Sequence, residues 1–205
     1  MIYLLRHAET EWNYQLRKQG RDDSPLTITG RSQAVAYGKV LEQLINYSGI
    51  DRDNVLIHVS PLGRTKITAK YLVDALSIPE CNVHYETRLI EFDYGDWSGL
   101  TNEEIEKHYP GALLVREVNK WYYTVPKGES YQDVEAKVDT WLEELPEDKT
   151  IIAVTHSVVS RVIRGKYLGM PKPVASLLEH PQNMIFRLNN QRIDSFDIMD
   201  FELAG

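Results

Sequence analysis

Short, nearly uninterrupted apolar runs recur along the chain, separated by longer stretches in which apolar residues are three or four positions apart. The runs IYLL (2–5), VLIHV (55–59) and TIIAVT (150–155) are rich in β-branched residues. Such runs are typical of strands that are buried on both faces of a parallel sheet. The pattern therefore predicts three central strands.

Helices are predicted between these strands. One spans about residues 29–47, and another opens at Ser130, where Asp133 three residues later completes a pattern similar to a capping box, and ends before Pro146. The segment VVSRVIRGKYLG (158–169) repeats the helical spacing and closes on glycine.

Alternation of strand and helix predicts an α/β fold, a three-layer α/β/α sandwich built on a mostly parallel sheet. The stretch VHYETRLIEF (83–92) is predicted to be extended. Two runs near the end, MIFRL (184–188) and RIDSFDI (192–198), are separated only by NNQ and predict a hairpin. An antiparallel strand is therefore expected at one edge of the sheet.

Composition narrows the functional classes. The chain has 205 residues, 42% hydrophobic and 26% charged, which is enough for one domain with a sizeable core, over residues 1–205. Its net charge of −7 argues against nucleic acid as a partner. The single cysteine, Cys81, and an apolar start that ends at Arg6 predict a cytoplasmic protein without a signal peptide or membrane span. The sequence is compatible with a homodimer and does not report an oligomeric state.

Polar residues with catalytic potential follow several of the predicted strands. In open α/β sheets, ligands bind beyond the carboxyl ends of the strands, so these side chains are expected to meet. The set consists of two histidines, two arginines, one carboxylate and one serine: Arg6, His7, Arg64, Glu91, His156 and Ser157.

The combination favours phosphoryl chemistry. Two guanidiniums match the oxygens of a phosphate, which they bind with paired hydrogen bonds. Their charge disfavours a metal ion and keeps a nearby imidazole neutral, so that a histidine can attack phosphorus as a nucleophile. Glu91 is then the expected proton donor to the leaving alkoxide.

Four motifs in this order, LRHAETEWN, SPLGRTKITA, LIEFDYGDWSG and VTHSVVSRVI, resemble the histidine phosphatase superfamily, which includes the cofactor-dependent phosphoglycerate mutases. The resemblance covers about residues 1–170 and extends to QGRDDSPLTITG, with Gly20, Leu26, Thr27 and Gly30 at family positions. It implies a phosphoglycerate mutase-like fold.

The resemblance also implies a role for each matching residue. His7 resembles the histidine that becomes phosphorylated, and Glu91 the acid and base. Arg6, Asn13, Arg64 and His156 resemble the residues that grip the phosphoryl group, and Gln19 and Gly20 lie at the first-loop substrate position. Ser157 replaces the glycine usual after the second histidine, but its backbone N–H can still donate. No metal ion and no other cofactor is implied.

Departures from the mutase pattern favour hydrolysis. Asn102, Tyr122 and Tyr123 stand where mutases have a lysine and an arginine pair, and Val158 replaces an asparagine. The predicted function is therefore a metal-independent phosphatase acting on a small phosphorylated metabolite. The alternatives are a cofactor-dependent phosphoglycerate mutase, a phosphate-binding regulator without turnover, and a metal-dependent hydrolase.

An insertion at about residues 100–129 is predicted to form a cap that sets substrate specificity, because loops at the active edge of a sheet usually do so. Its residues Trp121, Tyr122, Tyr123 and His108 either bracket the substrate or pack the cap against the core, and packing is favoured for Trp121 and one of the tyrosines. Arg116 and Lys120 are candidate cationic contacts. The identity of the substrate is not predicted.

Overall fold

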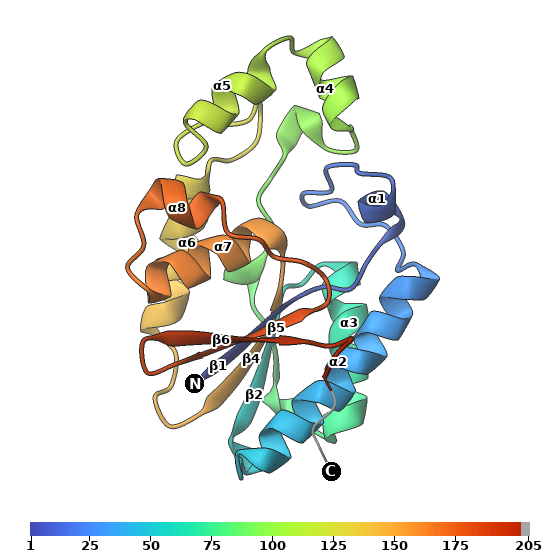
Figure 1. The fold of residues 1–205 in the computed structure, drawn as a ribbon, viewed down its shortest axis with the longest axis vertical. Helices are drawn as coiled ribbons and strands as arrows, with labels where there is room; N and C mark the ends of the chain where they lie inside the picture. Colours follow the sequence, from blue (N-terminus) through green and yellow to red (C-terminus); the bar gives the residue numbers. More distant parts are fainter. Residues whose placement is uncertain (202–205) are drawn as a thin grey trace.

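A six-stranded sheet runs through the computed structural model, which describes residues 1–201 (Figure 1). The spatial order is β3-β2-β4-β1-β5-β6. β1 to β4 run parallel, whereas β5 pairs antiparallel with β1, and β6 with β5. The strands are β1 (Ile2–Arg6), β2 (Val55–Val59), β3 (Val83–Tyr85), β4 (Thr150–Thr155), β5 (Met184–Asn189) and β6 (Arg192–Asp197). The predicted mostly parallel sheet with an antiparallel edge is confirmed.

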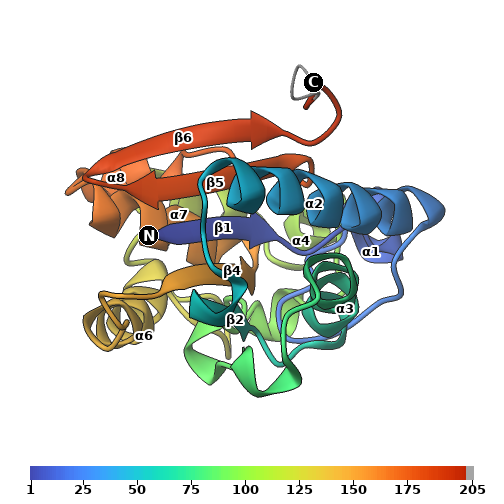
Figure 2. The ribbon, with the colours of Figure 1, turned by 90° about the horizontal axis from the view of Figure 1, so that it is seen from below.

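Helices cover both faces of the sheet, as Figure 2 shows. α2 (Ile28–Tyr47) and α3 (Gly63–Leu76) lie on one face, and α6 (Tyr131–Glu143) and α7 (Ser157–Tyr167) on the other. A hydrophobic core lies on each face of the sheet, and alternate residues of β1 pack into one or the other. Tyr3 and Leu5 pack with α2 and α3, and Ile2 and Leu4 pack with α6 and α7. Burial on both faces explains why the strand reads as an unbroken apolar run.

The predicted helix starts are present as caps. The Thr27 side chain accepts a hydrogen bond from the N–H of Gly30 at the start of α2. Ser130 and Asp133 form a complete capping box at the start of α6, each side chain bonding the backbone of the other residue. The hairpin is confirmed too, because Asn190 and Gln191, with φ of 49° and 58°, form the tight turn between β5 and β6.

The predicted extension over 83–92 was only partly correct. β3 ends at Tyr85, and a 3₁₀ turn over Thr87–Leu89 follows. Glu86 stabilises that turn, because its carboxylate accepts from the backbone N–H of Arg88 at 2.9 Å and pairs with the Arg88 guanidinium at 2.6 Å. The chain bends away from the sheet edge there and brings Glu91 back across it.

Segment 100–129 contains α4 (Asn102–His108) and α5 (Ala112–Val118), which lie at the top of Figure 1 beyond the end of the sheet. Trp121 is 4% exposed, and its indole N–H donates to the carboxylate of Glu135 in α6 at 3.0 Å. Trp121 therefore packs this segment against the core, as favoured from the sequence. Two short helices, α1 (Glu11–Tyr14) and α8 (Lys172–Ser176), complete the fold.

No helix within residues 1–201 is both long enough and apolar enough to cross a membrane.

Candidate active site

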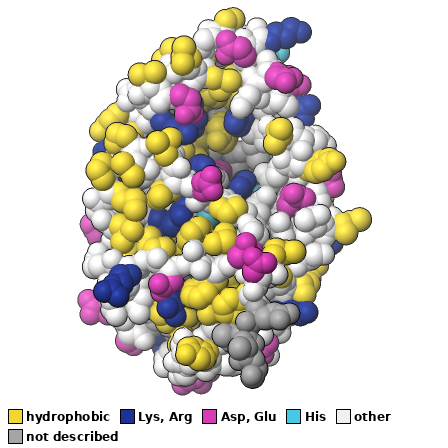
Figure 3. Space-filling view, viewed as in Figure 1, with side chains coloured by type: hydrophobic (Ala, Val, Ile, Leu, Met, Phe, Trp, Pro, Cys, Tyr) yellow, Lys and Arg dark blue, Asp and Glu magenta, His cyan; other side chains and the backbone are white. Residues whose placement is uncertain are grey.

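The carboxyl ends of the parallel strands open into a cavity of about 430 Å³. Figure 3 shows this hollow below the α4 and α5 segment, bordered by Lys and Arg side chains. Eight of the nine predicted site residues line it: Arg6, His7, Asn13, Gln19, Gly20, Arg64, Glu91 and Ser157. The ninth, His156, lies directly behind His7.

His7 directly follows β1 and is 2% exposed. Its backbone N–H donates to the Thr155 carbonyl of β4 at 2.9 Å, which continues the strand pairing into the site. The ring Nδ1 lies 2.8 Å from the carbonyl oxygen of Ala8, so Nδ1 carries the proton and Nε2 keeps its lone pair. Burial, followed by the charges of Arg64 and Arg6, holds the pKa of His7 well below its ordinary value. The imidazole is therefore neutral at physiological pH.

His156 follows β4 as the N-cap residue of α7, and its ring centroid lies 5.2 Å from that of His7. Its Nε2 is 2.7 Å from the hydroxyl of Ser60, the residue that follows β2. The opposite nitrogen, Nδ1, is buried and has no hydrogen-bond partner among the described residues. Burial, then the charge of Arg64, also lowers the pKa of His156 well below its ordinary value. Because a buried polar atom normally has a partner, this nitrogen is a candidate contact for a ligand bound beside His7.

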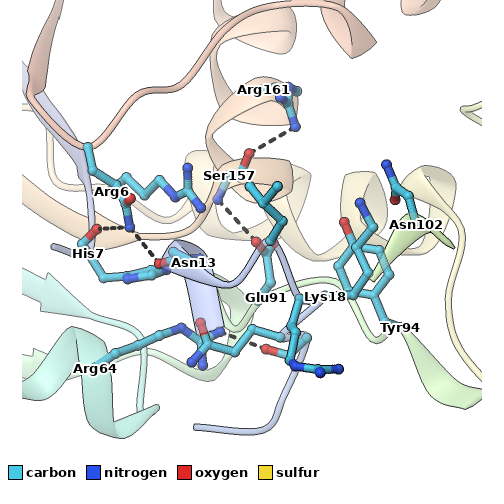
Figure 4. Close-up of a pocket in the computed structure, with 15 residues that line it drawn as sticks. Arg6, His7, Asn13, Lys18, Arg64, Glu91, Tyr94, Asn102, Ser157 and Arg161 are labelled. Carbon is cyan, nitrogen blue, oxygen red and sulfur yellow. Dashed lines mark hydrogen bonds between the residues drawn. The ribbon is translucent and has the colours of Figure 1, made fainter. Parts of the chain in front are cut away.

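Arg64, in the first turn of α3, is 1% exposed and points beneath the first loop. Its guanidinium donates to the carbonyl oxygens of Gly20 and Asp22, both at 2.6 Å, and pairs with Asp23 at 2.9 Å. The remaining Nε–H has no partner among the described residues. On the other side of His7, Arg6 donates to the His180 carbonyl at 3.2 Å. Figure 4 shows the two guanidiniums on either side of His7.

The side chains of the first loop differ in how free they are. Asn13 accepts from the Gln182 amide at 2.7 Å and from the Thr10 N–H at 3.2 Å through its oxygen, which leaves its NH₂ for the cavity. Gln19 is 6% exposed, and its amide is already bonded to Thr10 and Ser24. It lines the cavity while it holds the loop in shape.

Glu91 brings the only carboxylate among the described residues that line this cavity. Its two oxygens accept from the backbone N–H groups of Phe92, at 3.0 Å, and Ser157, at 3.1 Å. Ser157 is the first residue of α7, so the carboxylate lies at a helix N-terminus, where negative charge is favoured. The Ser157 hydroxyl accepts from Arg161, one turn further along the helix, at 2.9 Å.

Four contributors were not singled out in the sequence: Lys18, Ser60, Arg161 and Gln182. Ser60 follows a predicted strand directly, and Arg161 is four residues after Ser157 on the same helix, so spacing could have indicated both. Lys18 and Gln182 enter the site only through contacts between loops that are distant in sequence. Among residues 1–201, no group of three or more His, Cys, Asp or Glu side chains is arranged to hold a metal ion.

The buried histidines are expected to make the stability of the fold depend on pH. His7, His156 and His180 are at most 3% exposed, and burial lowers the pKa of each well below its ordinary value. Because the unfolded chain binds protons that the folded chain does not, stability is full above pH 6.5 and is lost as pH falls below it. Burial also lowers the pKa of His58, to about 4. Each of the four histidines costs about 1.4 kcal/mol per pH unit, so the free energy of unfolding in urea should be about 5 kcal/mol lower at pH 5.5 than at pH 7.5.

The matched variants are His180→Leu, which should remove about a quarter of that pH dependence, and His108→Leu at an exposed position of α4, which should leave it intact. Equal unfolding free energies at the two pH values in the unmodified protein would contradict the prediction.

The family model described as the histidine phosphatase superfamily (branch 1) matches residues 2–192. Fructose-2,6-bisphosphatase of Saccharomyces cerevisiae is 32% identical over 187 residues, which cover 91% of this chain and 38% of that protein. This chain thus matches well under half of the yeast protein's length.

Two relatives match over more of their own length. Phosphoserine phosphatase 1 of Hydrogenobacter thermophilus is 34% identical over 177 residues, covering 82% of this chain and 76% of that protein. The solved structure of a mycobacterial glucosyl-3-phosphoglycerate phosphatase superposes with a TM-score of 0.76 at 29% identity, covering 96% of each chain.

Proposed function

Because the chain belongs to the histidine phosphatase superfamily, we propose that it is a metal-independent phosphatase that transfers the phosphoryl group of a small phosphorylated metabolite to His7 and then to water. The observation that carries the proposal is the state of His7. Its ring is neutral, its Nδ1 is bonded to Ala8, and its Nε2 makes no hydrogen bond within the described residues of a cavity lined by Arg6 and Arg64. A fixed lone pair facing cationic donors suits attack on a phosphoryl group.

The reaction has two steps. In the first, Nε2 of His7 forms a bond to phosphorus as the ester P–O bond breaks, and Glu91 gives its proton to the departing alkoxide. In the second, Glu91 takes a proton from water, whose oxygen displaces the imidazole and releases inorganic phosphate. Arg6, Arg64 and the NH₂ of Asn13 hold the equatorial oxygens throughout, so the positioned donors supply much of the rate.

Hydrolysis is favoured over mutase activity by the residues at the mutase-specific positions. Tyr122 is 54% exposed, and the ring of Tyr123 stacks on Trp97 with centroids 5.8 Å apart; neither lines the cavity. Only Asn102, at the start of α4, reaches it. A bisphosphorylated intermediate would therefore lose the lysine and the arginine pair that mutases use, and water would compete with its return to His7.

The segment around α4 and α5 is proposed to act as the specificity cap, because Asn102 lines the cavity from its first turn. Residues 1–205 are proposed to act as one domain. The exposed thiol of Cys81 fits a reducing compartment such as the cytoplasm.

A substrate panel tests the proposed function. Phosphomonoesters are assayed for phosphate release in the presence of EDTA, and 3-phosphoglycerate is assayed with and without 2,3-bisphosphoglycerate. We expect phosphate release that EDTA does not inhibit. Isomerisation faster than phosphate release would replace the phosphatase by a mutase, and activity abolished by EDTA and restored by a divalent ion would indicate a metal-dependent hydrolase.

Arg64→Ala is expected to lower kcat/KM about 10²- to 10³-fold, because it removes a fixed donor to the equatorial oxygens. Arg64→Lys keeps the positive charge but loses the planar, paired donors of the guanidinium. Its kcat/KM should therefore lie between those of Arg64→Ala and the unmodified protein. Arg52→Ala, remote from the cavity, serves as the matched control. Turnover of Arg64→Ala at the unmodified rate, in a protein with an unchanged circular dichroism spectrum, would refute the assigned role.

A further inference from the structure

The cavity carries more positive charge than one phosphoryl group requires. Five cationic side chains and a single carboxylate line it: Arg6, Arg17, Lys18, Arg64 and Arg161, with Glu91. Two of the cations are neutralised elsewhere, since Arg17 pairs with Glu104 at 2.7 Å and Arg64 with Asp23 at 2.9 Å. Within residues 1–201, Lys18 and Arg161 form no ion pair. In the same residues Arg6 forms none either, but Arg6 adjoins His7, so Lys18 and Arg161 are the two cations that remain without an anionic partner once Arg6 is assigned to the phosphoryl group.

Lys18 lies apart from the cations that surround His7, whereas Arg161 lies between the two groups, since its charge acts on Arg6 as well as on Lys18. The charged groups that act on His7 are Arg64, Arg6 and His180, whereas those that act on Lys18 are Arg116, Lys120, Glu117 and Arg161. Figure 4 shows the same division, with Tyr94 and Asn102 across Glu91 from His7 and Asn13. The cavity therefore has two cationic ends, and Glu91 lies between them.

The position of Lys18 is fixed by its backbone. Its N–H donates to the carbonyl of Leu100 at 2.9 Å, and its own carbonyl accepts from the N–H of Gly99 at 2.8 Å. These bonds tie the first loop to the start of segment 100–129. The ammonium Nζ lies 5.9 Å from the ring centroid of Tyr94, inside the cavity.

A second layer of cations lies behind Lys18. Arg116 in α5 is 7% exposed, with its guanidinium 5.7 Å from the ring centroid of Phe92. Its ion-pair partner in the described residues is Glu117, at 3.6 Å, and the same carboxylate also serves Lys120 at 3.2 Å. Burial, then Arg116 and Lys120, lowers the pKa of Lys18 to about 8. Cations gathered so closely repel one another until an anion binds among them.

We propose that Lys18 and Arg161, assisted by the amide of Asn102, bind a second anionic group of the substrate. The inference rests on the proposed function and narrows it: the substrate is a phosphomonoester that also carries a carboxylate or a second phosphate. Its phosphoryl group lies against His7 and its second anion at the opposite end of the cavity. Lys18 thereby replaces, from the first loop, the cations that segment 100–129 lacks.

Matched esters test the inference. Glycerol 3-phosphate has a neutral tail, 3-phosphoglycerate replaces its terminal CH₂OH with a carboxylate, and glycerol 1,3-bisphosphate carries a second phosphate. We expect kcat/KM to be about 10- to 100-fold higher for the better of the two anionic esters than for the neutral one, as one charged hydrogen bond allows. Which of the two is preferred identifies the second anion.

The key variant is Lys18→Met, which should reduce that preference, measured as the ratio of kcat/KM for the anionic and the neutral ester, at least 10-fold. Lys18→Glu should reverse the preference towards phosphoethanolamine, which has a cationic tail. Lys107→Met on the exposed face of α4 removes the same charge outside the cavity and should change nothing. Equal rates on the anionic and neutral esters, or a preference that survives Lys18→Met, would overturn the inference.

A pH profile supplies a readout that a purely structural lysine would not give. The ratio of kcat/KM for 3-phosphoglycerate and glycerol 3-phosphate cancels the titration of the shared phosphoryl chemistry. The ratio should fall as pH rises through about 8, where free Lys18 loses its proton. The surrounding charges of Arg116, Lys120, Arg161 and Glu117 and the phenol of Tyr94 are common to both assays.

If the protein hydrolyses none of the esters, the proposed function has failed, and the second-anion site is decided by calorimetry instead. The Kd values of 3-phosphoglycerate, glycerol 1,3-bisphosphate and glycerol 3-phosphate are then compared directly in the unmodified and Lys18→Met proteins. Tighter binding of an anionic ester that depends on Lys18 supports the site. Equal Kd values overturn it.

Discussion

His7→Asn should lower kcat by about 10⁴-fold or more on every phosphomonoester that the protein hydrolyses, because it removes the proposed nucleophile. The substitution is structurally mild. Asparagine can still donate to the Ala8 carbonyl, and the backbone N–H of residue 7 keeps its bond to Thr155. Loss of turnover with an unchanged fold would then report the nucleophile itself.

Trapping the phosphohistidine intermediate tests directly whether His7 is the nucleophile. The unmodified protein, quenched within milliseconds of mixing with a ³²P-labelled ester, should hold label that is lost in acid and stable in base, as for phosphohistidine. His7→Asn should hold none, and His84→Asn, which removes an exposed histidine from β3, should hold as much as the unmodified protein. A label that persists in His7→Asn would move the nucleophile to another residue.

The site could be predicted from sequence wherever it depends on the sheet. Parallel strands share one edge for their carboxyl ends, so Arg6, His7 and His156 were brought together once the strands were recognised. The helix starts at Thr27 and Ser130 were readable because caps are local. These features depend on neighbours within a few residues, or on one rule of topology.

What the sequence did not reveal depends on contacts between distant loops. Lys18 enters the cavity because its backbone is bonded to Gly99 and Leu100, about eighty positions away. β3 ends at Tyr85, and the ion pair between Glu86 and Arg88 stabilises the 3₁₀ turn that follows. Neither interaction produces a periodic pattern of residues from which it could be predicted.

The same distance effect changes how the far side of the cavity is understood. Read residue by residue, Asn102, Tyr122 and Tyr123 remove the cations of a mutase and leave that side neutral. In the folded chain, Lys18 from the first loop and Arg161 from α7 supply positive charge to it. A substrate anion can thus be bound by elements that differ from those of the mutases. The affinity of the cavity for that anion depends on where the fold places its cations as well as on which residues occupy the mutase positions.

Glu91→Gln should separate the two steps of the reaction. With an alkyl phosphate, the leaving alkoxide needs the Glu91 proton, so kcat should fall about 10²- to 10⁴-fold. With p-nitrophenyl phosphate, the leaving phenolate is stable without a proton, and phosphorylation of His7 should stay fast. Water must then attack without its base, so phosphohistidine should accumulate.

Stopped-flow absorbance measures this difference. Glu91→Gln is expected to release a burst of p-nitrophenol close to one equivalent per active site, followed by slow turnover, and Glu103→Gln on the exposed face of α4 should behave as the unmodified protein. The glutamine oxygen can keep one of the bonds from Phe92 and Ser157, so α7 stays in place. Equal losses on alkyl and aryl esters without a burst would mean that Glu91 acts by holding the N-terminus of α7, and that another group moves the proton.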